Sequence, residues 1–439
     1  MYDELHAFER TVARLRDRFP SLIDLSTGRI ERLLERLGRP QDRMGPVIHV
    51  AGTNGKGSTA AFLRAMAEAA GLKAHVLTSP HLVRFAERIR VAGALISEAE
   101  LAALIDRMIA VNGEAPISFN EILTAMAFKA FAETPADVAI VEVGLGGRFD
   151  STNVFAAPAV SVITPIDYDH LELLGPELGK IAWEKAGIVK AGRPVVCARQ
   201  PEAALAAIEA EAQALGAPLM LMGRDFDAWE ERGRLMVQAP DRLLDLPAPS
   251  LPGAHQFANA GVAAMAALAW GHPRLDEAAI GRGVAGAVWP ARFQRLTAGP
   301  LAALCRARGS DLWLDGGHNP HAGQALADTV GKLAARDGRP VALVVAMYGR
   351  KDAQGFFAPF KGVVAQAAST TFDSPNAASA DELAEAARAA GLEAAAFPDV
   401  EAAVRAVLAA EGPAPHVLIC GGLHFAGEVL AMSPETWPV

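Results

Sequence analysis

A glycine-rich turn with a lysine and, two residues later, a serine hydroxyl is the part of the sequence best suited to chemistry. It reads His-Val-Ala-Gly-Thr-Asn-Gly-Lys-Gly-Ser at 49–58, between the apolar run 46–48 and a helical pattern from Ala60 to Ala70. Such a turn can cradle phosphate, because backbone N–H groups and the helix N-terminus face the anion and a lysine reaches its outer oxygens. In the common phosphate-loop pattern, a glycine stands where this chain has Val50, and the hydroxyl residue follows the lysine directly. Here Gly57 separates Lys56 from Ser58. We predict phosphate binding by Gly52, Thr53, Asn54, Gly55, Lys56, Gly57 and Ser58.

Two oxygen-bearing side chains that follow apolar runs are candidates for a metal site. Glu142 ends the run 138–141, and an acid at the end of a buried strand is costly unless it is paired or bound to a cation. Beside a phosphate loop that cation would be Mg²⁺, which takes carboxylate, hydroxyl and phosphate oxygens. Ser79 either turns the chain before a proline or offers its hydroxyl to the same ion. A salt bridge is the alternative for Glu142, and the nearby loop makes us favour the metal.

His170 and Lys185 are further candidates, each with an ordinary alternative. His170 follows the run 160–163, where a hydrogen-bonded loop histidine is more typical than a Mg²⁺ ligand, because Mg²⁺ prefers oxygen. Lys185 lies beside Trp183 at a helix end that Gly187 would cap. Such a lysine can have a lowered pKa and act as a nucleophile or add CO₂. The sequence alone favours a surface lysine with its charged end in water.

Asp315 and His318 belong to a polar segment, Asp-Gly-Gly-His-Asn-Pro at 315–320, that follows the apolar run 312–314. At the end of a strand they would face a cleft, although a plain turn explains the same residues. No Ser–His–Asp or Cys–His arrangement stands out, and no cysteine or histidine cluster has zinc spacing.

Apolar runs alternate with helical patterns along the whole chain, which predicts an α/β fold of parallel sheets covered by helices. Ligands of such sheets bind beyond the carboxyl ends of the strands, where the polar clusters above fall. Strands are predicted at Val47–Val50, Ala74–Leu77, Val138–Val143, Val160–Ile163, Pro194–Ala198, Leu312–Leu314, Ala342–Ala346 and His416–Cys420. Helices are predicted at Ile30–Leu37, Thr59–Ala70, Glu98–Val111, Ile122–Ala132, Ala203–Leu215, Gln256–Trp270, Ala322–Ala335, Ala380–Ala389 and Val400–Ala410.

A domain boundary is predicted near 288–292, where Val-Trp-Pro-Ala-Arg precedes a second strand–helix series. Residues 1–290 would form an N-terminal P-loop-type parallel-sheet ATPase domain, and residues 291–439 a smaller Rossmann-like α/β domain. The segment Gly223–Leu251, rich in proline and charge, is expected to be irregular or a β excursion.

Composition limits the function further. A net charge of −9 argues against broad nucleic-acid or membrane-surface binding, because both favour cationic patches. The three cysteines, Cys197, Cys305 and Cys420, are far apart, which suits buried thiols in a reducing cytosol. The first residues are charged and show no signal peptide, and no apolar stretch has the length of a membrane span. We therefore expect a cytoplasmic protein.

Taken together, these segments resemble the folylpolyglutamate synthase and dihydrofolate synthase family of Mur-ligase-like ATP-dependent amide ligases. The resemblance spans nearly the whole chain, in the family's order. The segments are 49–58, Thr-Ser-Pro-His-Leu at 78–82, Glu-Arg-Ile at 87–89, Glu-Val-Gly-Leu-Gly-Gly-Arg-Phe-Asp-Ser-Thr-Asn at 142–153, Asp-His at 169–170, Glu-Lys-Ala-Gly-Ile at 184–188, His-Gln-Phe-Ala-Asn-Ala at 255–260, Trp-Pro-Ala-Arg-Phe at 289–293 and 315–320. Ser-Pro-His-Leu and Gly-Gly-Arg-x-Asp point to the folate branch.

The resemblance implies ATP and two Mg²⁺ ions as cofactors, and K⁺ is a further candidate. It places Ser79 and Glu142 on one Mg²⁺, and Glu142, His170 and a carbamylated Lys185 around the second. Lys56, Glu142, His170 and Lys185 would be the catalytic residues. ATP would also contact Asn259, Arg292, Asp315 and, more weakly, His318, with domain closure bringing the second domain's residues to the nucleotide.

The implied substrates are L-glutamate and dihydropteroate or folates. The pterin would lie against an N-terminal loop at 24–30 with Ser26, Thr27, Gly28 and Arg29, and against Ser118, Phe119, Asn120, Glu121, Arg148 and Asp150. Asn120, Asn376 and the 26–28 segment differ from common family residues. The alternatives are a Mur-type ligase that joins an amino acid to a nucleotide-linked sugar, and a nucleotide-binding regulator without ligase activity. We expect a monomer.

Overall fold

The computed structural model describes residues 12, 15, 19 and 26–438. By its internal contacts the chain divides into two compact units. Unit 1 holds the described residues up to Pro80, together with Arg84–Ser250 and Phe257–Val288. Unit 2 holds His81–Val83, Leu251–Gln256 and the chain from Trp289 onward.

Unit 1 is built on an eight-stranded sheet of order β4-β3-β2-β5-β1-β6-β7-β8. Its central strands β1 (Val47–Ala51), β5 (Val138–Glu142) and β6 (Val160–Ile163) are buried throughout, as expected for apolar runs covered on both faces. β2 (Ala74–Leu77), β7 (Val195–Cys197) and β8 (Leu219–Leu221) continue the parallel sheet.

The edge of this sheet departs from the predicted parallel arrangement. β3 (Ile89–Val91) and β4 (Ala94–Leu95) run antiparallel and form a hairpin. Ala92 and Gly93, which join them, both have positive φ, the geometry of a tight two-residue hairpin turn. A strand this short leaves little alternation to read, so the sequence did not reveal it.

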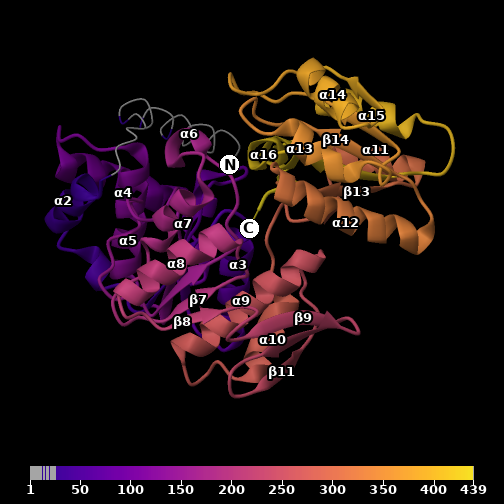
Figure 1. The fold of residues 1–439 in the computed structure, drawn as a ribbon. Coiled ribbons are helices and arrows are strands. Elements are labelled where there is room, and N and C mark those ends of the chain that lie inside the picture. The colour runs from indigo at the N-terminus through magenta and orange to yellow at the C-terminus, as the bar shows by residue number, and fades with distance from the viewer. Residues whose placement is uncertain (1–11, 13–14, 16–18, 20–25, 439) are drawn as a thin grey trace. The chain divides into compact units, whose positions relative to one another are not determined.

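Helices surround the unit 1 sheet (Figure 1), and α7 packs beside α8. Capping boxes fix the starts of two of them: Ser97 with Glu100, and Ser118 with Glu121. The helices are α2 (Gly28–Arg36), α3 (Lys56–Ala69), α4 (Glu98–Asn112), α5 (Phe119–Glu133), α6 (Leu171–Leu174), α7 (Leu178–Ala186), α8 (Glu202–Ala214), α9 (Ala254–Trp270) and α10 (Glu277–Gly286).

The segment predicted as irregular or β forms a three-stranded antiparallel sheet of order β11-β10-β9. Its strands are β9 (Asp227–Glu231), β10 (Arg234–Gln238) and β11 (Leu243–Leu246). Leu235, Val237, Leu244 and Leu246 alternate onto its buried face.

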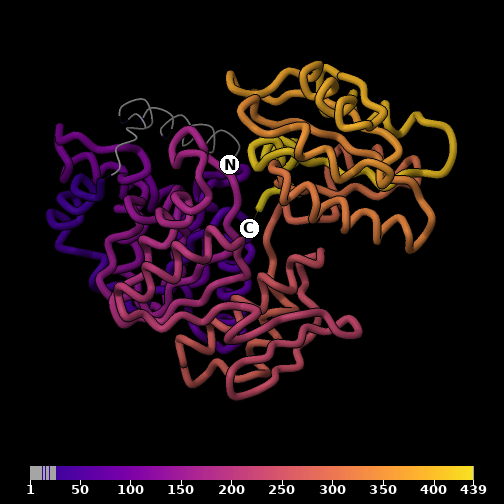
Figure 2. The backbone as a smooth tube through the Cα atoms, in the orientation of Figure 1, coloured from indigo at the N-terminus to yellow at the C-terminus, as the bar shows by residue number. Residues whose placement is uncertain are grey.

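Unit 2 is a six-stranded sheet of order β12-β13-β17-β14-β15-β16, and only β12 is antiparallel. Figure 2 follows the backbone of this unit, coloured from orange to yellow toward the C-terminus. Its strands are β12 (Gln294–Leu296), β13 (Asp311–Leu314), β14 (Val341–Val345), β15 (Gln366–Ser369), β16 (Ala394–Ala396) and β17 (His416–Cys420). Its helices are α11 (Pro300–Arg308), α12 (Pro320–Asp337), α13 (Ala353–Phe357), α14 (Ala380–Ala389), α15 (Val400–Leu408) and α16 (Leu423–Ala431). No helix in the described part of the chain has the length and apolar character needed to cross a bilayer.

Close helix packing in unit 1 gives a test of the fold. A Cβ added at Gly283 of α10 would lie 2.4 Å from the Cα of Met66 in α3, whereas a Cβ at Gly286 of the same helix meets nothing within 4 Å. Gly283→Ala should therefore lower the free energy of unfolding by about 1–3 kcal/mol, because the backbones must separate. Gly286→Ala should be neutral or stabilising by up to about 1 kcal/mol. Equal urea midpoints for the two variants would contradict this packing.

Candidate functional site

The phosphate loop leaves β1 and enters α3, and two of its glycines are required by their surroundings. Gly52 and Gly55 have φ of 146° and 86°, a region that side chains rarely adopt. A Cβ at Gly52 would lie 1.9 Å from the Oγ1 of Thr164, and one at Gly55 would lie 2.5 Å from the Oδ1 of Asn259. The buried Asn259 of α9, implied as an ATP contact, thus lies directly against the loop.

The segment that follows β6 holds the loop in place. The N–H groups of Thr53 and Asn54 donate to the carbonyl of Pro165, at 3.0 and 3.1 Å. The Thr53 hydroxyl donates to the carbonyl of Asp167 at 3.0 Å. Because a helix leaves the N–H groups of its first turn without intrahelical acceptors, the start of α3 at Lys56 is the part of the loop best placed to donate to phosphate.

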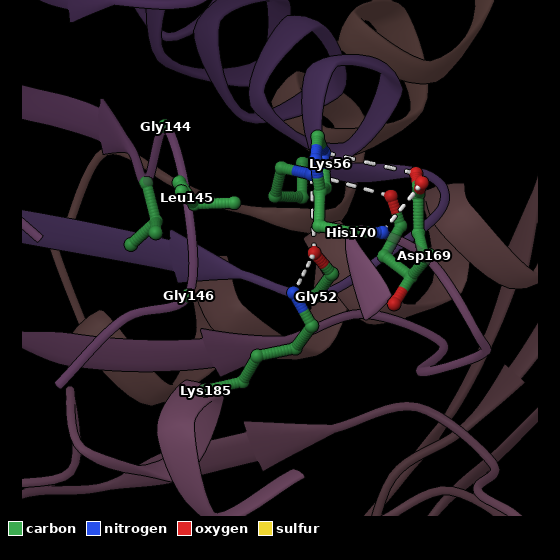
Figure 3. Close-up of a pocket in the computed structure, with 10 residues that line it drawn as sticks. Gly52, Lys56, Gly144, Leu145, Gly146, Asp169, His170 and Lys185 are labelled. Carbon is green, nitrogen blue, oxygen red and sulfur yellow. Dashed lines mark hydrogen bonds and ion pairs between the residues drawn. The ribbon is translucent and has the colours of Figure 1, made fainter. Parts of the chain in front are cut away.

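A pocket at the loop brings two lysines to one acceptor (Figure 3). The carbonyl oxygen of Gly52 accepts from the Nζ of Lys56 at 3.1 Å and from the Nζ of Lys185 at 3.0 Å. Lys56 also donates to the carbonyl of Thr53 at 3.2 Å. The pocket is lined by Gly52, Thr53, Lys56, Val143, Gly144, Leu145, Gly146, Asp169, His170 and Lys185.

Lys185 is buried, so the surface position that its sequence favoured is wrong. Burial, and then the charge of Lys56, lower the pKa of the Lys185 amine to about 7. Glycines allow close packing at the end of α7 that carries Lys185: a Cβ at Gly147 would lie 2.7 Å from the Glu184 carbonyl, and one at Gly187 would lie 2.3 Å from the Cβ of Arg148. Gly187 caps α7 with an ordinary helical φ of −59°, so close approach, not left-handed backbone, requires glycine there.

Oxygen ligands for a cation gather at the carboxyl ends of β2 and β5. Glu142 is buried at the end of β5. A Cβ at Gly144 would lie 3.4 Å from the Oδ2 of Asp150 and 3.5 Å from the Oγ of Ser79, so both side chains lie close to this glycine. The described residues contain no group of three His, Cys, Asp or Glu side chains set to hold a metal. This donor set fits Mg²⁺, which commonly takes one or two protein ligands and fills its shell with phosphate and water.

Two further pocket features extend the predicted site. His170 lines the pocket with a positive φ of 53°, and its N–H donates to the Oδ1 of Asp169 at 2.9 Å. Asp169 and the segment 143–146 were not predicted as site residues. The glycine-rich run after β5 was the available signal, since such a run lets backbone approach a ligand closely.

The predicted substrate segments meet in one ion pair. The Nε of Arg29, near the start of α2, lies 3.1 Å from the Oε2 of Glu121 in α5. The same carboxylate oxygen accepts from the N–H of Ser118 at 2.6 Å, so Glu121 also closes the capping box. Ser26, Thr27 and Gly28 lead into α2, and Phe119 and Asn120 form the first turn of α5. Asp24 and Leu25 lie outside the described residues.

Arg148 and Asp150 have structural partners. The guanidinium of Arg148 lies 3.9 Å from the ring centroid of Trp183 and 2.8 Å from the Oε2 of Glu211. Asp150 accepts from Thr152 through one oxygen and from the N–H of Leu145 through the other. Burial raises the pKa of the Asp150 carboxyl, and these hydrogen bonds oppose the rise.

In unit 2 the predicted residues Arg292, Asp315 and His318 also lie together. Asp315 follows β13 and is buried, and its two oxygens accept from the N–H groups of Phe293 and Gly317, each at 2.7 Å. Burial raises the pKa of Asp315, and Arg292 opposes the rise. Ala291 and Phe293 have φ of 53° and 44°, a strained backbone of the kind that clusters at functional sites. The Nδ1 of His318 lies 3.0 Å from the carbonyl of Gly316.

The lowered pKa of Lys185 predicts a pH dependence of stability. Between about 7 and 10.5 the unfolded chain holds a proton that the folded chain has lost, so the free energy of unfolding rises with pH in this window. The slope that Lys185 contributes should be on the order of 1.4 kcal/mol per pH unit. This slope is measured by urea titrations of wild type and Lys185→Met at several pH values in CO₂-free buffer. If the free energies of unfolding of the two proteins differ by the same amount at every pH, the lowered pKa of Lys185 is contradicted.

Comparisons with known proteins identify the family of this chain. A model of the Mur ligase middle domain matches residues 50–267, and one of the Mur ligase glutamate ligase domain matches residues 301–423. The Bacillus subtilis dihydrofolate synthase/folylpolyglutamate synthase is 34% identical over 421 residues, which is 92% of this chain and 93% of that protein. The Escherichia coli protein of the same description is 34% identical over 93% of this chain and 91% of its own.

Solved structures share the fold along the whole chain. Escherichia coli FolC in complex with DHPP and ADP aligns with a TM-score of 0.85 and 33% identity over 96% of both chains. Mycobacterium tuberculosis folylpolyglutamate synthase complexed with ADP aligns with a TM-score of 0.85 and 31% identity over 97% of this chain and 98% of its own. These findings confirm the predicted α/β fold, and the chain belongs to the dihydrofolate synthase/folylpolyglutamate synthase family of Mur ligases.

Proposed function

We propose that this protein is an ATP-dependent ligase that joins L-glutamate to dihydropteroate or to the glutamate tail of a folate. One observation carries the proposal: Lys56 of the phosphate loop and the buried Lys185 converge on one pocket, in a chain one third identical to such enzymes over nine-tenths of its length. A regulator needs a phosphate loop but not a second buried lysine beside carboxylate and hydroxyl oxygens.

The reaction would proceed in two transfers. A substrate carboxylate attacks the γ-phosphorus of ATP, which gives an acyl phosphate and ADP. The amine of glutamate then attacks the acyl carbon, and phosphate leaves as the amide forms. Lys56 and the first turn of α3 would hold the phosphates and stabilise the charge that moves during the first transfer.

A divalent metal would assist at the oxygen ligands near β2 and β5. We propose two Mg²⁺ sites, one with Ser79 and Glu142 and one with Glu142, His170 and carbamylated Lys185. The ions would neutralise phosphate charge when bound. A Yersinia pestis relative with 32% identity and a TM-score of 0.85 is described as complexed with AMPPNP and Mn ion. K⁺ stays a further candidate.

Carbamylation of Lys185 is chemically consistent with its surroundings. The neutral amine attacks CO₂ and loses one proton, which leaves a carbamate anion. A pKa lowered to about 7 makes the neutral amine available near neutral pH. The product replaces a cation by oxygen ligands of the kind that Mg²⁺ prefers.

We also propose a domain division, nucleotide and pterin contacts, an oligomeric state and a location. Residues 1–290 and 291–439 would divide into the ATP-binding and ligase domains, with Asn259, Arg292, Asp315 and His318 toward ATP. Ser26, Thr27, Gly28, Arg29, Ser118, Phe119, Asn120, Glu121, Arg148 and Asp150 would serve the pterin substrate. We propose a monomer in the cytoplasm, where buried, unpaired Cys197, Cys305 and Cys420 would stay reduced.

Glutamate-dependent phosphate release tests the function directly. The assay should be run with dihydropteroate, with tetrahydrofolates and with a UDP-sugar Mur substrate. Release with either pterin compound supports the proposal and shows which of the two folate reactions occurs. Release only with the UDP-sugar would establish the Mur-type alternative, and release with none would favour a regulator.

Replacing the loop lysine should stop ligation without unfolding the chain. In Lys56→Ala the phosphates lose their main side-chain cation, so kcat should fall by about 10²–10³-fold or more. The exposed Lys180→Ala on α7 is the matched control and should retain activity. Circular dichroism and thermal unfolding check that both variants fold. Near-normal product formation by Lys56→Ala would overturn the assignment.

The carbamate can be tested by chemical rescue. Lys185→Ala removes the amine and should lose most activity, and added short carboxylates such as acetate should restore part of it by supplying the missing oxygen ligands. In wild type, ¹³CO₂ should give a carbamate carbon signal in ¹³C NMR that Lys185→Ala lacks. If rescue fails and no such signal appears, Lys185 acts as an amine instead.

A further inference from the structure

A buried hydrogen-bond chain connects the strand before the phosphate loop to the opposite wall of the pocket. The Nε2 of His49 in β1 lies 2.9 Å from the Oγ1 of Thr152. That hydroxyl lies 2.5 Å from the Oδ1 of Asp150, which also accepts from the N–H of Thr152 at 2.9 Å. The other oxygen of Asp150 accepts from the N–H of Leu145 at 2.9 Å. Leu145 lines the pocket, whereas neither His49 nor Thr152 does.

The protons of this chain can be assigned from its geometry. Backbone N–H groups donate to both oxygens of Asp150, which favours its ionised form, and an ionised carboxylate only accepts. The single hydroxyl proton of Thr152 therefore points to Asp150. The Thr152 oxygen must then accept from the Nε2–H of His49. The Nδ1 of His49 is buried and has no hydrogen-bond partner among the described residues, and a buried acceptor left alone is more often tolerated than a buried N–H. Burial lowers the pKa of His49 to about 3, which agrees with a neutral ring.

This arrangement adds a side-chain donor to a carboxylate that two backbone N–H groups also hold. Asp150 lies on the loop after β5, and its Oδ2 and the Oγ of Ser79 both lie close to Gly144. A hydroxyl whose proton is directed by a rigid ring on a central strand holds the carboxylate in one rotamer. His49 is itself held by β1 and by an edge contact with Phe155, at 5.5 Å between ring centroids. These hydrogen bonds thus tie the pocket wall at Leu145 to the central strand β1.

We propose that His49 and Thr152 are positioning residues of the pocket, which act through Asp150 to hold the backbone at 144–145, beside the Ser79 hydroxyl, where Mg²⁺-bound nucleotide binds. The proposal rests on the proposed function only in taking nucleotide and Mg²⁺ as ligands of this pocket. Mutation of residues that orient metal ligands without touching the metal typically lowers metal affinity by about 10- to 100-fold.

Two pairs of variants separate hydrogen bonding from packing. His49→Phe keeps a ring on β1 and removes the donor, while His49→Gln places an amide N–H near the former Nε2. Thr152→Val keeps the volume and removes the hydroxyl, while Thr152→Ser keeps the hydroxyl. By calorimetry, the affinity for ADP in the presence of Mg²⁺ should fall about 10-fold in His49→Phe and in Thr152→Val. It should stay close to that of wild type in His49→Gln and Thr152→Ser.

The double variant His49→Phe/Thr152→Val should bind no more weakly than Thr152→Val alone, because both changes break one chain. His75→Phe is the control: His75 is equally buried in the same sheet, bonds to the Thr134 carbonyl and the Ala92 N–H, and does not line the pocket. It should lower thermal stability and leave ADP affinity unchanged. Additive losses, or an equal loss in His75→Phe, would overturn the proposal.

Histidine-selective ¹⁵N NMR of the ligand-free protein gives an independent reading that does not depend on catalysis. The His49 signals, identified by their absence from His49→Phe or, if that variant does not fold, from His49→Gln, should show the proton on Nε2. A proton on Nδ1 would show that His49 does not donate to Thr152 and would overturn the proposal. If wild type ligates no glutamate, the proposed function fails, yet these measurements still decide the role of His49.

Discussion

The site depends on one carbonyl oxygen that accepts from two lysines. Lys56 and Lys185 come from different helices and both donate to Gly52. Two ammonium groups this close repel each other, and the repulsion grows as water is excluded. The structure accommodates the pair because burial and Lys56 lower the pKa of Lys185, so one proton is lost readily. A phosphate chain or a carbamate would relieve the same repulsion, which is why this pocket suits anionic ligands.

Close backbone approach is the second constraint, and glycines make it possible. Gly52 and Gly55 let Thr164 and Asn259 touch the phosphate loop, and Gly147 lets the loop after β5 lie on the end of α7. Each contact joins segments that are distant in sequence. A side chain at any of these positions would displace the phosphate loop, the buried lysine or the pocket wall.

Much of the fold could be predicted because its signals are local. The strands His416–Cys420 and Ala74–Leu77 and the helix Ala380–Ala389 have the predicted bounds. The strands β15 and β16 were missed because alanine dominates them, and alanine has little preference for strands. The phosphate loop was visible as a motif, since its function depends on consecutive residues.

The burial of Lys185 and the ion pair between Arg29 and Glu121 could not be predicted from residue patterns, because both arise from tertiary contacts. The capping box at Ser118 and Glu121 did have a local signature, a serine followed three residues later by a glutamate. That signature was interpreted only through family resemblance, as part of a substrate site.

The nucleotide side and the proposed pterin side of unit 1 differ in how they are held. Around the phosphate loop, glycines in close contact leave little freedom, so few sequences fit. Arg29 and Glu121 are instead held by a side-chain ion pair and a helix cap. If a substrate carboxylate binds Arg29 as proposed, it competes with Glu121 for the guanidinium. The Glu121 carboxylate would then keep its hydrogen bond from the N–H of Ser118 in the capping box. The departures from common family residues expected at 26–28 and at Asn120 lie next to this pair in the sequence, not in the glycine-rich loop.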